Sequence, residues 1–120
     1  MQYQNVQQLA LENNYFRKVL FTNEHSQVVL MSVLPGDDIG REVHEDVDQV
    51  LVFVKGAGEA VVGKDKHHIG PGDMFVVPAG IEHDFTNTGN EPLKLFTVYS
   101  PPEHPDGVVQ ATKADAEPHS

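Results

Sequence analysis

The sequence contains no cysteine, few basic side chains and no long apolar run. The lack of cysteine excludes disulfide bonds, thiolate metal ligands and cysteine nucleophiles, and it is compatible with a reducing compartment. No stretch approaches the length of a membrane span, and the first residues lack the basic start and apolar run of a signal peptide. We therefore expect a cytoplasmic protein with no membrane partner.

The charge of the chain is strongly one-sided. Eight Lys and Arg residues stand against 18 Asp and Glu residues, which gives a formal net charge of −10. Such a surface repels the phosphate backbone of nucleic acids, so we expect no nucleic-acid partner. Many of the acidic residues lie between Asp37 and Asp48, and all of them except Glu42 are interpreted as a solvated rim.

The length of 120 residues suits one domain, spanning residues 1–120. Short runs rich in β-branched and aromatic residues alternate with turn-forming residues, and no long helical period interrupts them. This pattern is typical of an all-β sandwich or barrel. The expected strands are 16–21, 27–34, 41–44, 49–55, 59–62, 67–69, 75–77, 82–87 and 93–100.

The two ends of the chain read differently from this β core, which covers roughly residues 15–100. Residues 6–11 are compatible with either a helical turn or an edge segment. Residues 101–120 are rich in proline and polar residues, so we expect a tail that is laid over the barrel or disordered at its end. The apolar core and pocket wall are expected to contain Leu30, Val33, Leu51, Phe53, Val61, Phe75, Val77, Phe85, Leu95, Phe96 and Val98.

The most informative stretch runs from Gly72 to Asn87. It has the spacing GxxxxxPxGxxHxxxN, in which glycine and proline turns flank a short apolar strand. These turns place His83 at a defined point on the following strand. A histidine held in this way is a candidate metal ligand.

A second pattern lies upstream and consists of Gly36, Glu42, His44, Gln49 and Gly56. Together the two patterns resemble the two conserved motifs of the cupin superfamily, over roughly residues 30–100. The resemblance implies a double-stranded β-helix, a small jelly-roll barrel with a pocket inside. Two positions depart from the family pattern, because Glu42 replaces the first histidine and Gln49 replaces the glutamate.

The resemblance also implies a metal site. Glu42 and His44 are two residues apart on an extended segment and face one side, while Val43 faces the other. If that side is the barrel interior, Gln49 and His83 approach the same point. Two imidazoles and one carboxylate suit one divalent first-row ion, and iron, manganese, zinc and nickel all remain candidates. Gln49 would either ligate through its oxygen or orient a bound water.

Simpler roles for these residues remain open. His44 and His83 would equally fit as buried histidines that are satisfied by hydrogen bonds. Glu42 would then pair with Arg17 or Arg41.

Five further histidines lie outside the two motifs. His67 and His68 are expected to form a solvated pair on a strand, and His25 and His119 are expected at the surface or in the tail. His104 lies in the proline-rich tail. If the tail covers the barrel mouth, His104 is a candidate proton donor or acceptor.

Two classes of function follow. The first is a metal-dependent enzyme of dioxygenase, isomerase or lyase type that acts on a small organic molecule in the barrel mouth. The alternative is a non-catalytic module that binds a sugar or a small acid. A homodimer is expected from the family resemblance and from the general prevalence of two-fold assemblies, with exposed barrel edges and the strand 16–21 as candidates for pairing between subunits.

Overall fold

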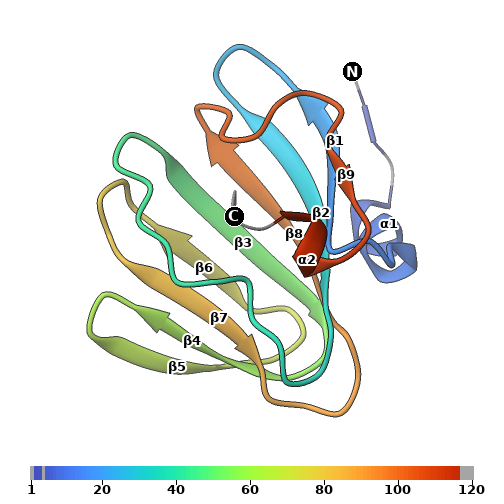
Figure 1. The fold of residues 1–120 in the computed structure, drawn as a ribbon, viewed down its shortest axis with the longest axis vertical. Coiled ribbons are helices and arrows are strands. Elements are labelled where there is room, and N and C mark those ends of the chain that lie inside the picture. Colours follow the sequence, from blue (N-terminus) through green and yellow to red (C-terminus); the bar gives the residue numbers. More distant parts are fainter. Residues whose placement is uncertain (1, 4, 117–120) are drawn as a thin grey trace.

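The computed structural model describes residues 2, 3 and 5–116, which form two antiparallel sheets (Figure 1). The larger sheet has the strand order β6-β3-β8-β2-β1-β9, and the smaller has the order β5-β4-β7. This architecture confirms the expected double-stranded β-helix. The elements are α1 (Val6–Glu12), β1 (Arg17–Thr22), β2 (Gln27–Val33), β3 (Asp48–Lys55), β4 (Gly58–Val62), β5 (Asp65–Ile69), β6 (Met74–Val77), β7 (His83–Asn87), β8 (Leu93–Ser100), β9 (Val109–Gln110) and α2 (Lys113–Ala116).

One hydrophobic core fills the space between the sheets. Strand β3 alternates between buried and less buried residues, so Leu51 and Phe53 point inward with no exposed surface. Phe53 meets Phe85 of β7 at a ring-centroid distance of 5.7 Å, which joins the larger sheet to the smaller one. Each such aromatic side chain contributes about 1.5–3 kcal/mol by its burial.

Glycine is required where β3 leads into β4. Gly56 has a φ of 97°, and a Cβ atom there would lie 2.9 Å from the carbonyl oxygen of Pro92. A Cβ atom on Gly58 would lie 2.4 Å from the carbonyl oxygen of Thr86. A side chain at either position would push the backbones apart.

The connection between β2 and β3, residues 34–47, runs along the open side of the barrel and is drawn in teal in Figure 1. Only one isolated bridge, between Glu42 and His83, replaces the strand expected at 41–44. A second isolated bridge joins Asp38 to Thr86 of β7, and further backbone groups of the connection form loop hydrogen bonds. Gly36, for example, donates to the carbonyl oxygen of Asn87, and Gly80 donates to that of His44.

Both ends of the β core are covered by ordered chain. Residues 6–11, for which the sequence allowed a helical turn or an edge segment, lie in the helix α1. The tail lies over the barrel, because β9 pairs with Arg17 and Lys18 of β1. Lys113 of α2 forms ion pairs with Asp37 and Asp38 in the connection 34–47. Within the described residues, no helix is long and apolar enough to cross a membrane. His119 lies outside the residues that the structure describes.

Candidate metal centre

The site begins with a short piece of backbone pairing. The amide of Glu42 donates to the carbonyl oxygen of His83 at 2.9 Å, and the amide of His83 donates to that of Glu42 at 2.9 Å. This bridge fixes the two side chains beside each other. His44 follows two residues later and returns to the same side, while Val43 is exposed, as expected for an extended segment.

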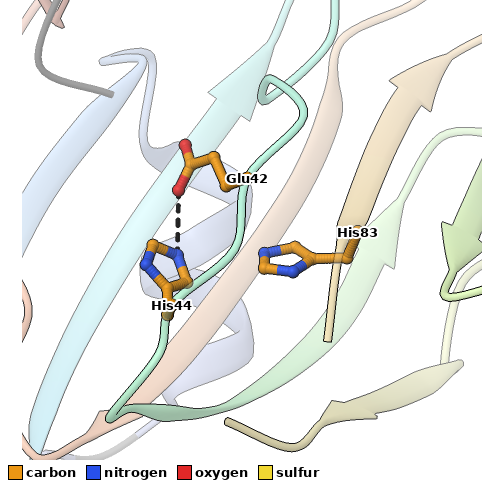
Figure 2. A group of neighbouring side chains, drawn as sticks. All are labelled: Glu42, His44 and His83. Carbon is orange, nitrogen blue, oxygen red and sulfur yellow. Dashed lines mark ion pairs between the residues drawn. The ribbon is translucent and has the colours of Figure 1, made fainter. Parts of the chain in front are cut away.

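The three side chains converge on one point. Figure 2 shows Glu42 and His44 rising from the connection 34–47 and His83 approaching from β7. One donor atom from each residue lies within 4.8 Å of the donor atoms of the other two. The Glu42 Oε2 atom lies 2.8 Å from His44 Nε2, and the two imidazole centroids are 5.3 Å apart. His83 is only 3% exposed, so the point of convergence is sheltered from water.

Hydrogen bonds on the outer nitrogens orient both imidazoles. The Nδ1 atom of His83 lies 3.0 Å from the carbonyl oxygen of Ile81, which can only accept, so Nδ1 carries the proton. The Nδ1 atom of His44 lies 3.4 Å from Glu103 Oε1. Both arrangements leave Nε2 as the nitrogen that is able to bind a metal ion.

The pKa values of the two histidines are shifted in opposite directions. The hydrogen bond to Glu42 raises the pKa of His44, with the charges of Glu42 and Glu103 adding to the effect against the cost of burial. Burial lowers the pKa of His83 and keeps its ring neutral. His83 is therefore ready to bind a metal, whereas His44 must first release the proton that it shares with Glu42.

The donor set fits a divalent metal ion. The Oε1 atom of Glu42 is buried and has no hydrogen-bond partner among the described residues. An unpartnered buried carboxylate oxygen is costly, and coordination of a cation would satisfy it. Two imidazole nitrogens and one carboxylate match the preference of first-row divalent ions, and they leave positions open for other ligands.

Gln49 is oriented but its role stays a prediction. It is buried on β3, and its amide donates to Thr97 Oγ1 at 3.0 Å, while the Thr97 hydroxyl donates to the carbonyl oxygen of Val50 at 2.8 Å. These two consecutive hydrogen bonds fix the orientation of the Gln49 amide group. Its Oε1 atom is buried without a partner among the described residues, so it is available to a metal ion or to a bound water.

The other candidate residues from the sequence have contacts outside the candidate metal centre. Arg41 pairs with Glu82 at 3.3 Å instead of with Glu42, and the described residues form no ion pair between Glu42 and Arg17. His67 and His68 are exposed on β5. They line a surface cavity of about 260 Å³ together with Glu59 and Lys66, away from the candidate metal centre.

His104 lies in the tail, and its role as a proton donor or acceptor stays a prediction. Its backbone amide donates to Gln27 Oε1 at 3.0 Å, and its carbonyl oxygen accepts from Gln27 Nε2 at 2.7 Å. Its ring is 5.1 Å from that of Tyr99, edge to face. Burial lowers the pKa of His104 to about 4, with the charge of Arg17 as a further cause.

Sequence reasoning missed Tyr99 and Glu103 around this centre and considered Arg17 only as a partner of Glu42. Tyr99 is fully buried, with its ring 5.9 Å from that of His44. Glu103 contacts His44 from the tail, and Arg17 lies close to Tyr99. The alternation of β8 could have identified Tyr99, because Leu93, Leu95, Thr97 and Tyr99 share the inward face. No local pattern identifies Glu103 or Arg17.

The fold and the donor set define a small double-stranded β-helix protein with a candidate metal centre in its barrel. Comparison with protein families agrees. The Cupin domain model matches residues 29–99, and the chain belongs to the cupin family.

The known proteins that are similar to this chain include three whose sequence identity to it ranges from 25% to 47%. YrkC of Bacillus subtilis, described as uncharacterized, is 47% identical over 118 residues, which cover 93% of this chain but only 63% of YrkC. The crystal structure of BH2720 from Bacillus halodurans matches with a TM-score of 0.94 and 39% identity, covering 96% of this chain and 92% of that one. A Thermotoga maritima protein described as a predicted oxalate decarboxylase matches with a TM-score of 0.62 and 25% identity, covering 67% and 70% of the two chains.

Proposed function

We propose that this chain is a divalent-metal-binding cupin that acts on a small organic molecule inside its barrel. Glu42, His44 and His83 hold the ion, and Gln49 completes or tunes its surroundings. The observation that carries the proposal is the convergence of three donor atoms within 4.8 Å, beside a buried Glu42 oxygen that lacks a partner among the described residues.

The bound ion supplies Lewis acidity, and redox chemistry as well if it is iron or manganese. With Glu42 as the only anionic ligand, the centre keeps a net charge of about +1, which favours an anionic or enolate-forming substrate. The protein contributes orientation and exclusion of water, because His44 and His83 are both buried. The Thermotoga maritima relative adds weight to a small carboxylate as the substrate class, with decarboxylation among the lyase reactions.

Metal titration of matched variants tests this proposal. His83→Ala should lose binding of manganese(II), cobalt(II) or zinc(II) while keeping a folded barrel, because the residue ligates the ion rather than filling the core. His67→Ala is the control, since His67 lies exposed on β5. Full metal binding by His83→Ala would show that the site is wrong. A chain that binds sugars or small acids without any metal would instead act as a binding module.

A further inference from the structure

Arg17 is a buried cation that forms no ion pair with the described acidic residues. It lies on β1 with 1% of its surface exposed, and it shares a strand face with the core residue Val19. Its Nη1 atom donates to Gln110 Oε1 at 2.9 Å, and its guanidinium lies close enough to the Tyr99 hydroxyl to act on the pKa of that group. Its Nε atom is buried without a hydrogen-bond partner, and Arg17 forms no ion pair within the described part of the chain.

This arrangement is costly unless something compensates the charge. A guanidinium group does not lose its proton in a protein, so burial cannot neutralise it. The neutral oxygen of Gln110 offsets only part of the lost hydration. A carboxylate is the natural complement, because the guanidinium presents its N–H groups in a fork that matches two carboxylate oxygens.

The surroundings place this cation next to the candidate metal centre. The Tyr99 ring is near both, because its centroid lies 5.9 Å from that of His44 and 5.1 Å from that of His104, and Arg17 acts on its hydroxyl. The Nε2 atom of His104 is also buried without a partner among the described residues. Unsatisfied donors or acceptors of Arg17, His104 and Glu42 therefore gather around one side chain, Tyr99.

We propose that Arg17, assisted by Tyr99 and His104, binds the carboxylate group of a small organic acid whose other end reaches the metal held by Glu42, His44 and His83. Only one part of this inference rests on the proposed function, namely that the other end of the acid reaches the metal. It narrows the substrate class to small carboxylic acids and makes Arg17 a specificity-determining residue.

Calorimetric titration with pyruvate and with its uncharged analogue pyruvamide tests the inference on manganese-loaded protein. The wild type should bind pyruvate at least about tenfold more tightly than pyruvamide, as expected for a buried charge-assisted contact. Arg17→Met should weaken pyruvate binding by about tenfold or more, and Arg17→Lys should restore part of the loss. Lys18→Met is the matched control, because the side chain of the neighbouring strand residue points to the other face.

Metal binding is measured separately by manganese EPR, and Arg17→Met should bind manganese as the wild type does. If the wild type binds neither manganese nor iron, nickel or zinc, the proposed function fails, and titration of the metal-free protein with pyruvate still decides the role of Arg17. Equal binding of pyruvate and pyruvamide by the wild type would overturn the inference, even if the Arg17 variants do not fold. Unchanged pyruvate affinity in Arg17→Met, or no pyruvate binding by the wild type, would overturn it as well.

Discussion

Glu42 and His83 exchange two backbone hydrogen bonds of 2.9 Å, and this bridge joins the connection 34–47 to the start of β7. The same two residues supply side chains to the candidate metal centre. Because a backbone contact sets the spacing of two donors, the site is largely formed before any ion binds, and removal of either side chain should leave the bridge intact.

Glu42→Gln should weaken binding of a divalent ion by at least about a hundredfold, because the substitution removes the only anionic donor of the set. Isothermal titration with zinc(II) or manganese(II) measures the change. Glu45→Gln is the matched control, since Glu45 is an exposed acidic residue of the same connection. Equal loss of affinity in both variants would mean that the general acidity of the surface attracts the ion, not Glu42.

Glu103→Gln tests how His44 is oriented. The carboxylate of Glu103 lies 3.4 Å from His44 Nδ1 and its side chain is 31% exposed. We expect metal affinity to fall by about tenfold, as is usual when the outer partner of a histidine ligand is weakened, with little change in stability. Asp106→Asn, which changes an exposed acidic residue of the same segment, controls for the loss of charge. If Glu103→Gln and Asp106→Asn bind metal with equal affinity, Glu103 does not orient His44.

The stability of the metal-free protein should depend on pH through His104. Its folded-state pKa is about 4 because of burial, whereas an unfolded histidine titrates near the ordinary value of 6.5. The unfolded chain thus binds the proton more readily, so this contribution is fully present above pH 6.5 and is lost as the pH falls toward 4. The loss is at most about 3 kcal/mol.

Urea unfolding between pH 4 and pH 7.5 measures this effect as the difference between the wild type and His104→Gln. The difference isolates His104 from His44, whose raised pKa acts with the opposite sign. An identical pH dependence in the two proteins would show that His104 is not buried in the neutral form.

Gln27 should anchor the tail. It is fully buried, and its amide group bonds the backbone amides of Glu103 and His104 and the carbonyl oxygen of His104. Gln27→Leu leaves these groups unpaired and should cost about 1–3 kcal/mol, with faster amide hydrogen exchange in residues 103–110. Gln8→Leu, on the exposed face of α1, is the control, and unchanged exchange in Gln27→Leu would contradict the anchoring role.

The resemblance of the two motifs to the cupin family implied both the barrel and the approach of Glu42, His44 and His83, and the structure brings these three side chains together. The predicted strand faces were less accurate in β8. Phe96 and Val98 were expected in the core with Leu95, yet they are only half-buried, and Tyr99 occupies the inward face instead. A list of apolar residues ignores the two-residue alternation that decides which of them face inward.

The rest of the site depends on contacts that no local pattern encodes. Glu103 meets His44 only because the tail folds back and Gln27 holds it there. Arg17 stands in a strand where an arginine is usually exposed, and its burial depends on Tyr99 and Gln110, which lie far away in the sequence. Such long-range contacts are visible only in three dimensions.

The central claim is a divalent metal ion held by Glu42, His44 and His83, and elemental analysis of untagged protein purified without chelators tests it most directly. The account predicts about one iron, manganese, nickel or zinc ion per chain in the wild type and almost none in His83→Ala. A wild-type protein that carries no metal, and regains none on reconstitution with each of the four ions, would contradict it.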